Sequence, residues 1–130
     1  MKEYFRNFFN KSDNKKKVSI EFDGVIKFTL KIEDLIIGNL ELKEKHWVFY
    51  YSEDFKTQNV YRRLAGFSDL EKTYESQVLW PFFKIRIPGL KQPMIREIIE
   101  SEKLNKDDEA SLLRRFGRVT MSNPYVLEPY

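Results

Sequence analysis

Strict alternation of apolar and polar residues constrains this chain more than any other feature. Over residues 26–32, Ile, Phe, Leu and Ile alternate with Lys, Thr and Lys. Residues 18–22 repeat the pattern, and Asp23-Gly24 between the two segments is a favoured hairpin turn. A period of two puts the apolar side chains of a strand on one face and the polar side chains on the other, which is exposed to solvent. The two segments therefore predict an antiparallel sheet.

Further strands are expected along the same sheet. Residues 35–42 predict a third strand, broken at Gly38 by a bulge or a bend. Residues 46–51 are mostly β-branched or aromatic and predict a fourth strand. Residues 119–127 are expected to add a last short strand.

The second half of the chain changes to a helical period. A short helical turn is expected over residues 59–64, and a helix over residues 93–102 begins at a proline suited to the first turn. Another helix is expected over residues 106–116, with Asn105 as its N-cap and a stop at Gly117. Together the segments predict an α+β fold. Its small, strongly curved antiparallel sheet (a partial barrel) carries two or three packed helices.

The N-terminal 17 residues differ from the rest of the chain. Tyr4, Phe5, Phe8 and Phe9 form one aromatic stripe on a helix, and residues 11–17 read as a polar linker. We therefore expect residues 1–17 to be an aromatic helix and linker, and residues 18–130 to be one domain. The stripe either closes a groove on its own domain or docks on a partner.

Composition argues against several classes of protein. The chain has no cysteine, no signal peptide is recognisable, and no run approaches the ~20 apolar residues of a membrane span. A cytoplasmic location is therefore expected. The net charge of +3 is mild, so direct binding to nucleic acid is not expected to be strong.

Signatures of catalysis are missing as well. The sequence contains no glycine-rich phosphate loop and no kinase catalytic-loop or magnesium-loop motif. The single histidine, His46, lies inside a strand pattern and cannot build a histidine-rich zinc site. We expect no catalytic residue, no cofactor and no metal. A small enzyme that uses His46 or paired carboxylates remains a distant alternative.

Several short motifs recur in an order that resembles a known family. They are Gly38-Asn39-Leu40, Trp47 to Tyr51, Phe55, Pro81-Phe82-Phe83, Ile87-Pro88-Gly89-Leu90, Arg96, Asp107-Asp108, Leu112-Leu113, Phe116-Gly117, Asn123-Pro124-Tyr125 and Glu128-Pro129. In this order they resemble the N-terminal subdomain of HipA-type serine/threonine kinases of toxin–antitoxin systems, over about residues 18–129. The chain departs from that family where Gly89 follows Pro88 directly, without the usual acidic residue. It departs again after Gly117, where the family has an acidic residue and a Gly-Ala pair.

The resemblance implies a subdomain without catalytic residues. In that family it packs on the kinase core and helps to contact a helix-turn-helix DNA-binding antitoxin. Split versions carry it on a separate chain that acts as a regulator or antitoxin. We therefore expect a non-catalytic accessory chain, and a separately encoded HipA-like kinase as its partner.

Aromatic residues are the candidates for the partner interface. Trp80, between Leu79 and Pro81, is the first candidate, because tryptophan is enriched in interface hot spots. The others are Phe83, Phe5 and Phe9, although Phe82 and Phe83 also fit a core role, since large apolar side chains usually bury. The alternative is a β-rich nucleic-acid-binding module in which Trp47, Tyr50 and Tyr51 stack on bases.

Overall fold

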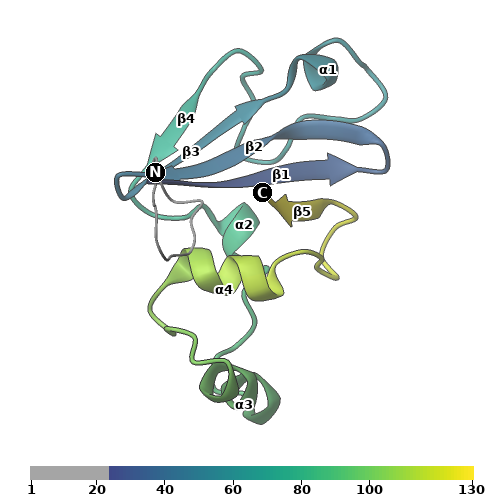
Figure 1. Cartoon of the computed structure of the whole chain (residues 1–130). Helices are drawn as coiled ribbons and strands as arrows, with labels where there is room; N and C mark the ends of the chain where they lie inside the picture. The colour runs from purple at the N-terminus through teal and green to yellow at the C-terminus, as the bar shows by residue number, and fades with distance from the viewer. Residues whose placement is uncertain (1–23) are drawn as a thin grey trace, which may run out of the picture.

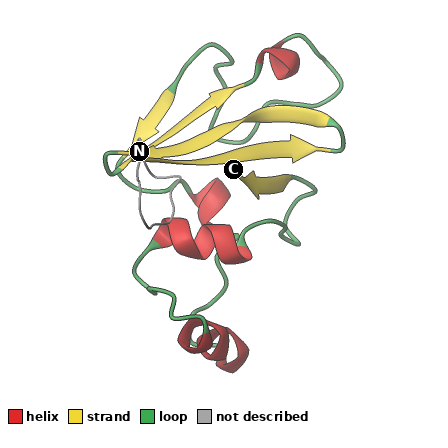
Figure 2. Ribbon diagram, viewed as in Figure 1, coloured by secondary structure: helices red, strands yellow, loops and turns green. Residues whose placement is uncertain are grey.

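A computed structural model of the chain describes residues 24–130, which form one open, five-stranded antiparallel sheet and four helices (Figures 1 and 2). The strands are β1 Val25–Ile32, β2 Leu35–Lys43, β3 His46–Tyr51, β4 Tyr74–Ser76 and β5 Val126–Pro129. The helices are α1 Glu53–Lys56, α2 Pro81–Lys84, α3 Pro93–Ser101 and α4 Glu109–Phe116. The strand order β4-β3-β2-β1-β5 leaves β4 and β5 at the edges. The expected α+β class with an antiparallel sheet is confirmed.

Tight hairpins join the three central strands. Glu44 and Lys45 connect β2 to β3 with φ angles of +48° and +68°, the backbone of a type I′ turn. The β1–β2 register shifts between Leu30 and Lys31, which leaves Ile37 opposite no residue of β1. This bulge lies beside Gly38, where the sequence predicted an irregularity. A Cβ at Gly38 would lie 2.6 Å from the Tyr50 carbonyl oxygen, so no larger residue fits there unless the backbone moves.

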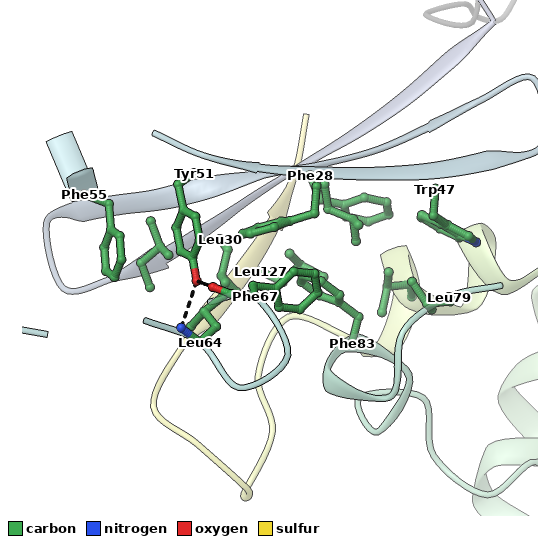
Figure 3. Close-up of a cluster of buried hydrophobic side chains, with 14 of the residues drawn as sticks. Phe28, Leu30, Trp47, Tyr51, Phe55, Leu64, Phe67, Leu79, Phe83 and Leu127 are labelled. Atoms are coloured by element: carbon green, nitrogen blue, oxygen red, sulfur yellow. Dashed lines mark hydrogen bonds between the residues drawn. The ribbon is translucent and has the colours of Figure 1, made fainter. Parts of the chain in front are cut away.

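The core fills one face of the sheet. In Figure 1, α2 and α4 lie against this face, while α3 lies farther out, beyond α4. Figure 3 shows the packed side chains: Phe28, Leu30, Trp47, Tyr51, Phe55, Leu64, Phe67, Leu79, Phe83 and Leu127, each at most 3% exposed. Strands β1 and β3 supply four of these ten residues, and for β1 the period of two predicted which side chains face the core.

A buried phenol organises the long connection between α1 and β4. The hydroxyl of Tyr51 accepts a hydrogen bond from the Leu64 backbone N–H at 2.9 Å and donates one to the Phe67 carbonyl at 2.5 Å (Figure 3). Burial raises the pKa of this hydroxyl, so it stays protonated and keeps its donor. Phe67 is thereby held in the core although it belongs to a segment without helix or strand.

The expected helical turn over residues 59–64 is wrong. The helical turn in this part of the chain is α1, which begins earlier, directly after Ser52. The Ser52 hydroxyl caps it by accepting a hydrogen bond from the Phe55 N–H at 3.1 Å. Farther along, the Gln58 side chain donates to the Phe55 and Tyr61 carbonyls and accepts from the Val60 and Tyr61 N–H groups. These bonds take the place of helical ones, so the segment is an ordered loop.

The two longer helices agree with the sequence, with one correction at a cap. Helix α3 covers almost all of the expected 93–102, and α4 covers most of 106–116. The N-cap of α4 is Asp108 and not Asn105, since the Asp108 carboxylate accepts a hydrogen bond from the Ser111 N–H at 3.2 Å. The last strand is β5, at the end of the expected 119–127 segment and slightly beyond it. The strand expected over residues 18–22 and the helix and linker of residues 1–17 lie outside the described residues.

Candidate protein-binding surface

An apolar surface extends from the end of β4 across α2. It consists of Val78, Trp80, Pro81, Phe82 and Ile85, and is called here the β4–α2 surface. Val78 is 64% exposed and Ile85 is 51% exposed, while Trp80 and Phe82 are half-buried. Large apolar side chains with this much exposure, close together in the chain, mark a candidate contact surface.

Local sequence fixes which side chains of this segment point outward. Pro81 occupies the first turn of α2, where its missing N–H costs no hydrogen bond, and Trp80 precedes it in an extended conformation. Leu79 and Phe83 are 1% and 0% exposed, so they anchor the segment in the core. Pro81 and Ile85, four residues apart on one helical turn, are left facing solvent.

Aromatic rings support the surface from beneath. The ring centroid of Phe67 lies 5.3 Å from that of Trp80 and 6.2 Å from that of Phe82, both edge-to-face. Phe83 extends the cluster, 5.1 Å from Phe82. Rings held in this way lose little further freedom when a partner binds, which favours affinity.

The structure separates the four residues predicted to contact a partner. Trp80 is half-buried, so part of its ring lies on the surface while the rest packs against the core. Phe83 is fully buried, so it supports the surface from below and offers no area to a partner. Phe5 and Phe9 lie outside the described residues.

Sequence reasoning missed Val78 and Ile85. Both are exposed because Leu79 and Phe83 turn into the core, and the intervening residues cannot turn inward at the same time. The available signal was a run from Val78 to Ile87 with too many apolar residues for one buried face. That excess becomes informative only when the inward positions are known.

A buried arginine joins α2 to the C-terminal segment. The Arg86 side chain is 3% exposed, and its two terminal nitrogens donate to the carbonyl oxygens of Gly117, Arg118 and Tyr125 and to the Asn123 side-chain oxygen, at 2.9 to 3.2 Å. Burial lowers the pKa of the guanidinium to about 10. Among the described residues its Nε has no hydrogen-bond partner. Arg86 thus fixes Tyr125, whose ring lies 5.9 Å from Phe82 at the rim of the β4–α2 surface.

The structure places His46, on which the enzyme alternative rested. His46 is exposed at the start of β3, and its Nδ1 lies 3.2 Å from the Glu44 carbonyl oxygen. Within the described part of the chain, no group of three or more His, Asp or Glu side chains is placed to hold a metal ion. None of the helices described there is long and apolar enough to cross a bilayer.

Two of the three aromatic residues that the nucleic-acid-binding alternative requires on the surface are buried. Trp47 is 3% exposed and Tyr51 is 2% exposed, so neither ring can stack on a base. Tyr50 lies on the opposite face of the sheet, where its hydroxyl donates to the Glu41 carboxylate at 2.8 Å. Burial and that carboxylate raise the pKa of Tyr50 to about 12. A carboxylate beside the remaining ring would repel a phosphate backbone.

Comparison with protein families gives a match over most of the described residues. The family model for the HipA N-terminal domain matches residues 29–122. The match covers β2, β3, β4 and all four helices, including the whole β4–α2 surface, and it lies within the 18–129 expected from the motifs. No curated protein matches the chain.

Proposed function

We propose that this chain, which belongs to the HipA N-terminal domain family, is a non-catalytic subunit that binds a separately encoded HipA-like serine/threonine kinase. The family places the chain in the context of toxin–antitoxin kinases. Within that context the chain acts as an accessory regulator or antitoxin, in the cytoplasm. A helix-turn-helix DNA-binding antitoxin is the second partner of the assembly.

The observation that supports a binding role is the β4–α2 surface. Val78 and Ile85 are the two most exposed large apolar residues between β4 and α3, and they flank a tryptophan held rigidly on Phe67. Binding hot spots combine such an aromatic anchor with a surrounding apolar patch that excludes water. Covering this surface with a protein partner would therefore remove apolar area from water, which favours binding.

The proposed role needs no chemistry from this chain. A regulator acts by the free energy of binding one state of its partner in preference to another. What this chain must supply is a rigid and complementary surface. The Tyr51, Phe67 and Arg86 contacts supply that rigidity from three different segments.

The decisive experiment compares two identical substitutions. Val78→Glu puts a charge into the β4–α2 surface, and Val60→Glu puts the same charge on a loop where Val60 is 78% exposed. Both variants are expected to fold, because neither side chain is in the core. Calorimetry with the kinase chain from the adjacent reading frame should show Val78→Glu weaker by about 2 kcal/mol, roughly thirtyfold in Kd. Val60→Glu should bind like the parent chain.

Trp80→Ala is the less decisive variant. Because Trp80 also packs on Phe67 and Phe83, its loss lowers the stability of the isolated domain as well as partner affinity. Thermal melts of the variant separate the two effects. If Val78→Glu binds the kinase as tightly as Val60→Glu does, the β4–α2 surface is not the interface and the proposal fails.

A further inference from the structure

Helix α3 has an amphipathic sequence but no buried residue. Its apolar side chains are Met94, Ile95, Ile98 and Ile99, at one helical face by their i, i+1, i+4, i+5 spacing. Met94 is 74% exposed, and none of the four belongs to the hydrophobic core. A helix of nine residues is shorter than the ~12–15 that an isolated helix needs in water, so most of its stability must come from packing. The surface that the domain provides for that packing is incomplete.

A groove runs along one flank of this apolar face. It has a volume of about 740 Å³ and is lined by Leu90, Lys91, Arg96, Ile99, Glu100 and Lys106. We call it the α3 groove. Leu90 and Ile99 form its apolar part, and α3 and the segments on either side of it supply the rest. Its volume falls within the range of ~300–1,000 Å³ typical of binding pockets.

The charges of the α3 groove are unbalanced. Three cations, Lys91, Arg96 and Lys106, face a single carboxylate, Glu100. Among the described residues none of the three cations has an ion-pair partner. Glu102, directly after α3, is engaged by Nε and Nη2 of Arg115 at 2.9 and 3.0 Å.

The remaining acidic residue of α3 does not offset this excess. Glu97 follows Arg96 directly and therefore lies about 100° round the helix, outside the residues that line the groove. An apolar strip beside unpaired cations is complementary to a segment with apolar anchors and carboxylates.

We propose that the α3 groove is a second docking site, which binds an acidic segment with apolar anchors from a partner protein. The apolar anchors cover Leu90 and Ile99, and the carboxylates pair with Lys91, Arg96 and Lys106. The site is distinct from the β4–α2 surface and has the opposite character, since its selectivity comes from charge. The domain can thus hold two protein segments at once.

The test uses the isolated chain and two synthetic peptides. One peptide carries Leu at positions i, i+3, i+4 and i+7 with Glu elsewhere, and the other replaces every Glu by Lys. Titration into the ¹⁵N-labelled chain should shift the amide resonances of Leu90, Arg96, Ile99 and Lys106 with the acidic peptide only. The affinity should fall on the order of tenfold when salt is raised from about 50 to about 500 mM, because screening weakens exposed ion pairs.

A charge-reversal variant makes the result specific to this groove. In the Lys91→Glu, Arg96→Glu, Lys106→Glu variant the preference should invert, so that the basic peptide binds and the acidic peptide does not. All three side chains are exposed and unpaired within residues 24–130, so the fold should be retained, which circular dichroism checks. Arg62→Glu, another exposed and unpaired cation of that region, is the control and should leave acidic-peptide binding unchanged.

Three outcomes overturn the proposal. Equal shifts with both peptides, or none with either, remove the charge selectivity. Shifts of the same amides by a single-stranded oligonucleotide, with none by the acidic peptide, make the groove a nucleic-acid site. Concentration-dependent dimerisation lost on Met94→Glu makes the α3 face an interface between copies. The peptide titration contains no kinase, so its failure leaves the proposed function standing. Failure of the kinase-binding experiment likewise leaves the α3 groove proposal standing.

Discussion

Arg86→Met should be the most damaging single substitution of a polar residue in the described part of the chain. Arg86 donates four hydrogen bonds to acceptors on Gly117, Arg118, Asn123 and Tyr125. Hydrogen bonds from a charged donor contribute about 1.5–3 kcal/mol each, so the gross contribution is about 6–12 kcal/mol. Methionine matches the apolar part of the side chain but satisfies none of the four acceptors.

Desolvation of the guanidinium opposes this contribution. The lowering of its pKa to about 10 corresponds to a desolvation cost on the order of 3 kcal/mol at neutral pH. The net loss should therefore be about 3–9 kcal/mol, and the lower part of this range agrees with the ~3–5 kcal/mol found when one partner of a buried charged contact is removed. That is a large part of the ~5–15 kcal/mol by which domains are stable.

Urea denaturation followed by tryptophan fluorescence measures the loss directly. Arg86→Lys keeps the charge but not the fork of donors, and it should recover less than half of the stability. Arg62→Met is the control: its side chain is exposed and has no partner within residues 24–130, so its free energy of unfolding should change by less than about 0.5 kcal/mol. The reasoning is refuted if Arg86→Met lies within about 1 kcal/mol of the parent chain with an unchanged m-value.

Three further predictions concern the hairpin and two titrating groups. Replacing Glu44-Lys45 by Asn-Gly should raise the free energy of unfolding by about 1 kcal/mol, because both residues have positive φ. Urea denaturation measures this gain, and an unchanged stability would show that the two residues are not strained. Neutral Tyr50 stabilises the fold below pH 10, and this contribution is lost as pH rises through about 12. The stability difference from Tyr50→Phe should therefore shrink over that window, and a constant difference contradicts the pairing with Glu41. The hydrogen bonds from Arg115 lower the pKa of Glu102 from 4.5. Their contribution to the stability of the fold is therefore present above pH 4.5 and is lost as pH falls through the lower pKa of the folded state. The urea midpoint of Glu102→Gln should differ from that of the parent chain at pH 7, and the two midpoints should converge in acid.

The sheet could be predicted from sequence because its signal is local. Alternation in residues 26–32 reports directly which side chains face the core, and the β-branched and aromatic residues of 46–51 indicate a strand. The structure has β1 and β3 at these positions. Helix α3 and helix α4 were equally accessible, since Pro93 and Gly117 mark one end of each. Each of these signals is contained within about ten residues, so no knowledge of the rest of the chain is needed.

The candidate surface was only partly accessible from sequence. Trp80 could be named as an interface candidate, because tryptophan is enriched in binding hot spots. Phe83 could not be assigned to the core with confidence, and Val78 and Ile85 could not be placed at all. Phe83 is buried against Phe67, which reaches the cluster from a loop ordered by Tyr51, and Val78 and Ile85 are left exposed beside it.

Tertiary structure alone decided the role of Arg86 and the character of α3. Nothing near Arg86 in sequence indicates that residues more than 30 positions away provide its acceptors. Nor does the apolar stripe of α3 show that the domain leaves it without a buried residue. Sequence by itself determined the strand and helix periods and the helix ends at Pro93 and Gly117, because these follow from bonds between near neighbours. Which faces meet, and which stay open for a partner, follows from contacts between distant segments, and those exist only in the folded chain.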